Sequence, residues 1–236
     1  MSTLSAHNSE LGKRSTSGSA PPPDFNRLAG PYRWLEYLTF GPWLARARCA
    51  FLPRLSHCRN VLVLGDGDGR FTARLLGASP DVRIHAIDAS PAMLRALVRR
   101  AGPDAGRVST GLADVRLWRP ANDAKPYDAI FTHFFLDCLT TAEIQSMAEA
   151  LRPSLLPTAV WIVSEFAAPR GIYGRCFARP LIWGLYRVFG ALTGLTVRTL
   201  PDHHLALPTA GFALRDRRTW LGGLLVSEFW STVPTA

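Results

Sequence analysis

Short apolar runs alternate with amphipathic stretches along most of the chain, a pattern typical of strands alternating with helices. The clearest apolar run covers residues 61–64 and leads directly into three glycines at alternate positions between Gly65 and Gly69. A continuous apolar run of this kind is typical of a strand buried on both faces of a parallel sheet. We therefore predict a strand over 60–65, a tight turn, and a helix over 70–78.

The same alternation continues to the end of the chain. Ser90 followed by Pro91 predicts a helix start, because serine is a good N-cap and proline fits the first turn. Thr140 offers a cap for a helix to about Leu151, and another helix is expected from about 42 to 52, ended by Pro53. Further apolar runs predict strands over 82–88, 108–113, 159–166, 211–217 and 221–229. Another strand is expected to begin at Tyr127, and its exit loop reaches Leu139. These elements favour an α/β fold.

The glycine loop is the first candidate binding site. A loop without Cβ atoms lets backbone N–H groups and a helix N-terminus approach a ligand closely, which favours a nucleotide-like cofactor. A dinucleotide fingerprint has the spacing G-x-G-x-x-G, whereas here the third glycine comes one residue early and Arg70 takes the final position. The loop therefore resembles motif I of the class I S-adenosylmethionine-dependent methyltransferases. That resemblance implies that Gly65, Asp66, Gly67 and Gly69 contact the cofactor.

The resemblance covers roughly residues 25–230 and is most specific over 61–94 and 127–139. It points to the ubiquinone/menaquinone-biosynthesis C-methyltransferase group. It also implies a Rossmann-like, doubly wound sheet of seven strands, which is mostly parallel and ends in a C-terminal antiparallel hairpin. Phe25, Ala29 and Tyr32 match an N-terminal segment of that group, although Asn26 stands where an aspartate is usual. Tyr32 is accordingly a candidate cofactor contact; the alternative is packing alone.

Asp88 follows the second predicted strand, 19 residues beyond Gly69. An acid at the carboxyl end of this strand can accept hydrogen bonds from both ribose hydroxyls. The resemblance extends through Asp88-Ala89-Ser90 to Met93, and it implies that Ala89 and Met93 also contact the cofactor. The alternative reading of Asp88 is a plain helix cap.

Asp114 follows the third predicted strand. In the resembling family an acid at this position commonly binds the adenine amino group, and the backbone of the next residue, Val115, contacts the ring. The alternative is that Asp114 is a turn aspartate.

The exit of the fourth predicted strand supplies candidate catalytic groups. Ligands of open α/β sheets bind beyond the carboxyl ends of strands, so residues from His133 to Asp137 are expected to face the reacting methyl. His133 is the best-placed base, because imidazole titrates near neutral pH, and Asp137 is a candidate either to orient it or to act alone. His133 and Phe134 are also candidate cofactor contacts. The alternative is that His133 only donates a hydrogen bond.

One position departs from the resembling family. Many class I enzymes carry an acid two residues before the first motif glycine, where Val63 stands here. Asp66 and Asp68 are candidates to replace that acid electrostatically, next to the cationic amino group of the cofactor.

Composition and charge limit the possible domain organisation and the possible binding partners. The chain has 236 residues and a formal net charge of +9, and its arginines are scattered rather than clustered. Nucleic acid is therefore not an expected partner, and scattered arginines are read as solvated faces. Residues 1–23 are rich in small polar residues and predict a disordered tail. Residues 24–236 are expected to form one domain, with a helical cap over 24–57 and an apolar insertion over 169–208.

The apolar insertion leaves its role open. Residues 181–195 suit a lid over an apolar acceptor, an interfacial helix at a membrane, or a helix packed on the sheet edge. No run is long and apolar enough to predict a transmembrane span, and no signal peptide is visible, so a cytoplasmic location is expected, with peripheral membrane contact as an option. The four cysteines form no C-x-x-C pair. Two adjacent side chains, His203 and His204, need not converge on one ion, and no metal ligand is assigned.

Three functions compete at this point. The first is S-adenosylmethionine-dependent methyl transfer to a small acceptor, expected to be apolar or aromatic, such as a quinone precursor, a phenol or a lipid. The second is a non-catalytic S-adenosylmethionine-binding or scaffold protein of the same fold. The third is a nicotinamide oxidoreductase, against which the glycine spacing argues. Neither the acceptor nor the oligomeric state can be derived from the sequence.

Overall fold

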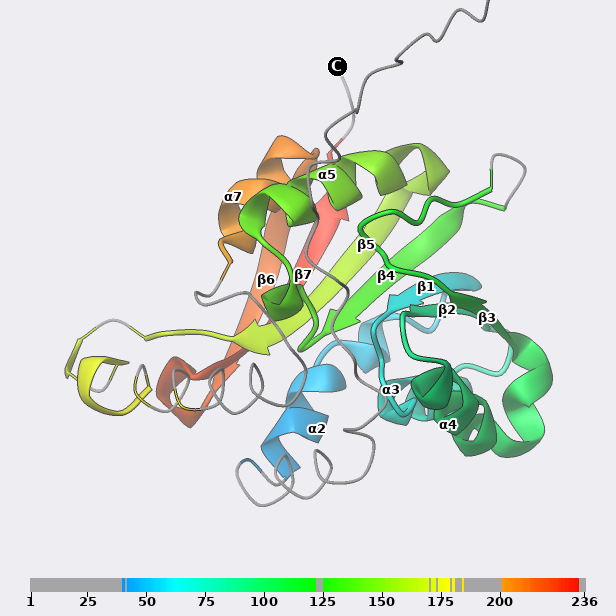
Figure 1. Cartoon of the computed structure of the whole chain (residues 1–236), viewed down its shortest axis with the longest axis horizontal. Coiled ribbons are helices and arrows are strands. Elements are labelled where there is room, and N and C mark those ends of the chain that lie inside the picture. Colours follow the sequence, from blue (N-terminus) through cyan, green and yellow to red (C-terminus); the bar gives the residue numbers. More distant parts are fainter. Residues whose placement is uncertain are drawn as a thin grey trace, which may run out of the picture.

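The computed structural model describes residues 40, 42–121, 125–169, 171–172, 174–178, 180, 184 and 201–233. Seven strands form one sheet in the order β3-β2-β1-β4-β5-β7-β6 (Figure 1). Strands β1 to β5 pair in parallel, and β7 runs antiparallel to both β5 and β6. The expected mostly parallel sheet with an antiparallel hairpin is confirmed. The strands are β1 (Asn60–Leu64), β2 (Arg83–Asp88), β3 (Val108–Leu112), β4 (Tyr127–His133), β5 (Leu155–Phe166), β6 (Phe212–Trp220) and β7 (Leu225–Thr232).

Helices cover both faces of the sheet (Figure 1). The α-helices are α2 (Pro42–Arg48), α3 (Arg70–Ala78) and α4 (Pro91–Ala101) on one face, and α5 (Thr141–Leu151) and α7 (His203–Thr209) on the other. Short 3₁₀ segments are η2 (Leu52–Arg54), η3 (Gly102–Arg107), η4 (Leu136–Cys138), η5 (Arg152–Ser154) and η7 (Leu221–Gly223), and η6 (Gly174–Ala178) is a π-helix.

The central strand β1 is apolar at every position after Asn60 because both of its faces are buried. Val61 and Val63 pack into the core under α3 and α4, whereas Leu62 and Leu64 pack into the core under α5 and α7. Successive side chains of a strand point to opposite faces, so one run of four apolar residues supplies two separate cores. The position where many class I enzymes carry an acid is thus a core position here, since Val63 is 1% exposed.

Local capping signals place the helix starts as predicted. The Ser90 side chain accepts a hydrogen bond from the Met93 N–H at 3.3 Å and begins α4. Thr140 and Glu143 form a reciprocal capping box at the start of α5, with Thr140 N donating to Glu143 at 2.7 Å. Such caps satisfy N–H groups that have no partner within the helix.

Several predicted boundaries are wrong, including the ends of the last two strands, which reach Trp220 and Thr232 rather than 217 and 229. The helix expected to reach about residue 52 ends at Arg48, where the chain tightens into three-residue turns that lead to η2. Strand β5 begins at Leu155 rather than 159, since Leu155 already pairs with Tyr127. The last strand begins at Leu225 rather than 221, because Gly222 and Gly223 have φ values of 63° and 91° and form the turn of the hairpin.

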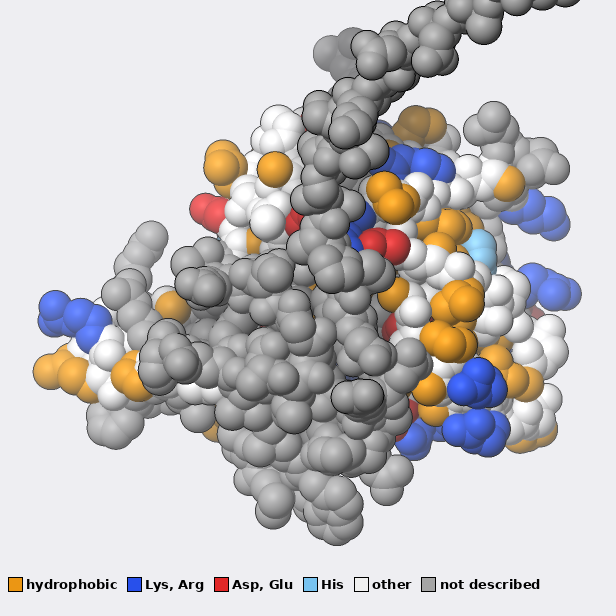
Figure 2. All heavy atoms as spheres, in the orientation of Figure 1, with side chains coloured by type: hydrophobic (Ala, Val, Ile, Leu, Met, Phe, Trp, Pro, Cys, Tyr) orange, Lys and Arg blue, Asp and Glu red, His pale blue; other side chains and the backbone are white. Residues whose placement is uncertain are grey.

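Several predictions lie outside the described residues, namely the tail over 1–23, the Tyr32 contact and most of the apolar insertion, including nearly all of 181–195. Within the described ranges, no helix has both the length and the apolar character needed to cross a membrane. On the face shown in Figure 2, the described Lys and Arg side chains lie in separate small groups among hydrophobic side chains.

Candidate cofactor site

The three glycines of the loop after β1 have different neighbours. All three have positive φ, at 67° for Gly65, 59° for Gly67 and 79° for Gly69. A Cβ on Gly65 would lie 2.1 Å from the Phe135 ring, and one on Gly69 would lie 2.7 Å from Leu97 Cα in α4. A Cβ on Gly67 would meet only the Met93 sulfur, at 4.0 Å. Gly65 and Gly69 therefore allow close packing within the protein, whereas Gly67 borders space that none of the other described residues fills.

Two aspartates of the loop stabilise it from within. Asp66 accepts a hydrogen bond from the Thr72 N–H at 2.8 Å in the first turn of α3. Burial raises the pKa of Asp66, opposed by its hydrogen bonds with Thr72. Asp68 instead contacts two arginines, with Oδ1 3.2 Å from Arg70 Nε and Oδ2 2.6 Å from Arg100. The Asp68 carboxylate is thus already paired with cations of the chain.

Asp88 lies at the carboxyl end of β2, beside the glycine loop. The loop is joined to this strand by a 2.9 Å hydrogen bond from Gly65 N to Ile87 O. Asp88 Oδ1 accepts a hydrogen bond from the Ser90 N–H at 2.8 Å, so the carboxylate also supports the start of α4. Burial raises the pKa of Asp88 to about 6, against the opposing effect of N–H groups around it. The helix-cap reading and a role in ligand binding are compatible, because a carboxylate accepts several hydrogen bonds.

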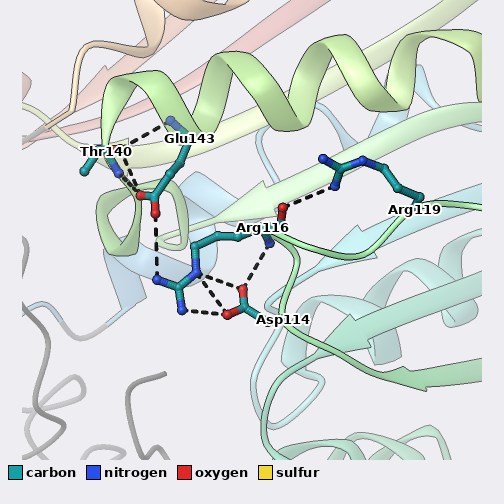
Figure 3. Close-up of polar contacts among 5 residues, drawn as sticks. All are labelled: Asp114, Arg116, Arg119, Thr140 and Glu143. Carbon is teal, nitrogen blue, oxygen red and sulfur yellow. Dashed lines mark hydrogen bonds and ion pairs between the residues drawn. The ribbon is translucent and has the colours of Figure 1, made fainter. Parts of the chain in front are cut away.

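The carboxyl end of β3 adjoins this region, since Ala113 N donates to Asp88 O at 3.1 Å. Asp114 is held by Arg116, whose Nε lies 2.9 and 3.0 Å from the two carboxylate oxygens and whose terminal nitrogen lies 2.6 Å from Oδ2 (Figure 3). This hydrogen bonding lowers the pKa of Asp114. Arg116 also lies 3.7 Å from Glu143 of the α5 capping box, and Val115 is buried in the core.

His133 projects from the end of β4 toward α3. Its Nδ1 lies 2.9 Å from Ser164 Oγ in β5, and its ring meets the Phe71 ring edge-on at 4.4 Å. The Nε2 atom is buried and has no hydrogen-bond partner. Burial and the nearby Arg48 charge hold the pKa of His133 well below 6.5, so the imidazole is neutral at physiological pH. Ser164 therefore helps to orient His133, and a role for Asp137 stays a prediction.

The chain turns sharply after His133. Phe134 has a φ of 54°, an uncommon conformation for a residue with a large side chain, and its N–H donates to Ser164 O at 2.7 Å. The next two N–H groups, of Phe135 and Leu136, donate to Glu165 Oε1 at 3.0 and 2.8 Å. The turn that carries Phe134 is thus held by β5. Asp137 follows in η4 and is partly buried.

Three residues at this end of the sheet were not predicted from the sequence: Arg116, Ser164 and Glu165. Burial, with the neighbouring Asp137 charge, raises the pKa of Glu165 well above 4.5. Its Oε2 is buried without a hydrogen-bond partner. The sequence signal that could have identified Glu165 is an acid in the otherwise apolar fifth strand. Arg116 could have been found because it lies two residues after Asp114, a predicted site residue.

Comparison with known proteins covers this same region. Residues 61–157 match the family described as methyltransferase domain, a span that includes the glycine loop, Asp88, Asp114 and the turn after β4. Trans-aconitate 2-methyltransferase from Rhodococcus jostii (strain RHA1) is 34% identical over 134 residues, which cover 55% of this chain and 47% of that relative. The chain therefore spans less than half the length of this curated relative.

Over residues 61–157 the chain is thus similar to a methyltransferase domain. Among solved structures, the S-adenosylmethionine-dependent methyltransferase SibL superposes with a TM-score of 0.63 at 20% identity, covering 92% of this chain and 64% of that one. The mitomycin 7-O-methyltransferase MmcR gives a TM-score of 0.66 at 13% identity, with 89% and 60% covered. Identities this low establish the fold alone. Together the matches support a methyltransferase fold for this region of the chain.

Proposed function

We propose that this protein catalyses S-adenosylmethionine-dependent methyl transfer to a small-molecule acceptor. The observation that carries the proposal is the open space that the described residues leave at Gly67, bordered by the Met93 sulfur, next to the partly buried Asp88 carboxylate at the end of β2. A glycine with no internal packing reason beside such a carboxylate suits a ligand that carries a ribose. The methyltransferase match over the same residues supports this assignment.

Each candidate residue then has a proposed role. Asp88 accepts hydrogen bonds from the ribose hydroxyls, and Ala89 and Met93 flank the adenosine. Asp114 accepts from the adenine amino group while Arg116 holds its carboxylate in place, and the Val115 backbone contacts the ring. The loop from Gly65 to Gly69, including Asp66, faces the amino-acid end of the cofactor. Tyr32 is proposed to cover it from the N-terminal segment.

S-adenosylmethionine, when bound, supplies a methyl group activated by its positively charged sulfur. What the chain must add is alignment of the acceptor with that methyl and exclusion of water. We assign alignment to the turn at Phe134, which the Ser164 carbonyl and the Glu165 carboxyl hold in one conformation. His133 is proposed as a positioning residue, because a buried neutral imidazole of low pKa is a weak proton acceptor. Asp137 remains the candidate base.

Two acceptor classes have support. An apolar or aromatic acceptor is favoured by the rings that gather beyond β4 and β5, where Phe166 lies 5.1 Å from both Phe134 and Phe40. A carboxylate acceptor is favoured by the name of the curated relative and by Arg48, whose guanidinium lies 5.1 Å from the Phe134 ring. We propose the aromatic class first, since rings line this part of the structure, and the carboxylate class second. Membership of the ubiquinone/menaquinone group stays a prediction.

The test is formation of S-adenosylhomocysteine from S-adenosylmethionine with two acceptor panels, one of phenols and quinols and one of di- and tricarboxylic acids. Turnover with either panel supports the proposal and assigns the acceptor class. Cofactor binding without turnover on any panel would support the alternative of a non-catalytic S-adenosylmethionine-binding protein. Asp137→Asn tests whether Asp137 is the base. Unchanged turnover in this variant would show that Asp137 has no part in the mechanism.

A further inference from the structure

Two neighbouring histidines converge on one buried carboxylate at a distance from the glycine loop. His203 and His204 stand in the first turn of α7, and Glu228 lies in β7. His203 Nε2 lies 2.9 Å from Glu228 Oε2, and His204 Nε2 lies 2.9 Å from Glu228 Oε1. The two imidazoles thus contact different oxygens of the same group, although adjacency in the sequence gave no reason to expect it.

The start of α7 is fixed in a way that makes this convergence stable. The Asp202 side chain caps the helix by accepting from Leu205 N at 3.1 Å, and Asp202 N donates to Thr141 Oγ1 in α5 at 2.9 Å. The two imidazole rings lie nearly side by side, with centroids 4.6 Å apart and an interplanar angle of 34°. The helix start is therefore held against α5, with both rings directed toward β7.

The carboxylate is a buried anion with cationic or polar groups on several sides. The Glu228 side chain is fully buried. The Trp230 Nε1–H donates to Oε2 at 3.2 Å, and Arg217 Nε lies 3.2 Å from Oε1. A buried carboxylate that stays ionised has to be compensated by positive charge.

We propose that His203, His204 and Glu228 bind a divalent transition-metal ion, with zinc as the reference ion. Two imidazoles and one carboxylate are a common ligand set for zinc that leaves a fourth position open. One ligand atom from each residue can be chosen so that all three lie within 4.8 Å of one another. A tetrahedral zinc site needs roughly 3.4 Å between ligand atoms, so the shifts required are small. The His204 side chain is 41% exposed, which leaves it room to adjust.

The surrounding residues fit this assignment. Trp230 is placed to orient the Glu228 ligand through its indole N–H, as groups around metal ligands commonly do. Arg217 is a competitor, because its guanidinium shares Oε1 and brings positive charge to the site. Its side chain is 44% exposed and is free to swing into solvent when an ion enters. A bound ion would join α7 to the C-terminal hairpin, independently of methyl transfer.

The test is calorimetric titration of the full chain with zinc chloride at pH 7.5, after removal of any histidine tag and treatment with a chelator. We expect one saturable site in the wild type, and at least a tenfold weaker affinity in His204→Ala. His57→Ala is the matched control, since His57 is an exposed histidine outside the cluster, and it should bind as the wild type does. Arg217→Ala should bind zinc more tightly, a gain that a merely structural arginine would not give.

A second measurement distinguishes loss of the metal site from misfolding of the variant. Far-UV circular dichroism of metal-free His204→Ala should match that of the metal-free wild type, while its melting temperature should be somewhat lower because the contact with the buried Glu228 carboxylate is lost. Zinc should raise the melting temperature of the wild type and of His57→Ala but not of His204→Ala. The proposal is overturned if the wild type shows no saturable binding, or if His204→Ala and His57→Ala bind zinc equally. Neither result bears on cofactor binding, so the methyltransferase proposal stands or falls separately.

Discussion

His133 and Ser164 are paired across β4 and β5 by a hydrogen bond of 2.9 Å between Nδ1 and Oγ, while the other ring nitrogen of His133 is buried without a partner. Ser164 Oγ in turn lies 3.2 Å from Ala47 O and 3.0 Å from Ser227 Oγ. This chain of polar atoms links α2, β4, β5 and β7 beneath the candidate site. Its position makes His133 part of the framework that holds the turn at Phe134.

The burial of His133 predicts a specific pH dependence of stability. The unfolded chain takes up a proton on this residue below pH 6.5, but the folded chain does not, because the folded pKa lies well below that value. Stability therefore falls as the pH drops through 6.5, by about 1 kcal/mol between pH 7.5 and 5.5. Urea unfolding of the wild type and His133→Gln should show this extra loss in the wild type alone. An identical pH dependence in the two proteins would contradict the buried, neutral imidazole.

The raised pKa of Asp88 predicts that cofactor affinity depends on pH. The ionised carboxylate is the better acceptor for ribose hydroxyls, and it becomes protonated as the pH falls through about 6. The dissociation constant for S-adenosylhomocysteine should therefore rise between pH 7.5 and 5. Asp88→Asn should weaken binding by roughly 10- to 100-fold at pH 7.5 and remove that pH dependence. Binding that is equally tight at both pH values would argue against Asp88 as the ribose acceptor.

The different neighbours of the loop glycines predict that their substitutions separate binding from stability. Gly67→Ala and Gly69→Ala both force a side chain into positive φ, at a cost of about 1–2 kcal/mol. Gly69→Ala also places a Cβ 2.7 Å from Leu97 Cα in α4, which should add about 1–3 kcal/mol. Gly67→Ala should thus be the more stable variant in urea and yet lose cofactor affinity. Equal stability of the two would show that α4 yields freely to the new side chain.

The pair formed by Asp114 and Arg116 predicts unequal effects of two substitutions. Asp114→Asn removes the acceptor proposed for the adenine amino group and should weaken S-adenosylhomocysteine binding several-fold. Arg116→Ala removes a partly exposed ion pair, which is worth about 1 kcal/mol of folding stability or less. Calorimetry on both variants distinguishes the roles: a larger loss in Arg116→Ala would mean that the arginine itself contacts the ligand and that Asp114 is its support.

Local signals made much of the fold predictable. The apolar run at 61–64 specified a strand buried on both faces, and the Ser90 and Thr140 caps specified two helix starts, because each depends on residues close in sequence. Contacts between distant residues could not be read in this way. Glu165 accepts from Phe135 N across 30 positions, and Glu228 meets His203 across 25. Adjacency gave no reason to expect His203 and His204 to converge, whereas the buried Glu228 carboxylate of another element brings them together.

The central claim is that the glycine loop and Asp88 bind S-adenosylmethionine. The most direct measurement is calorimetric titration of the wild type and Asp88→Ala with S-adenosylmethionine, S-adenosylhomocysteine and NADH, with far-UV circular dichroism as the check on folding. We predict micromolar binding of both sulfur compounds to the wild type, no binding of NADH, and loss of binding in a folded Asp88→Ala. Unchanged affinity in that variant, or no binding of either sulfur compound to the wild type, would contradict the account.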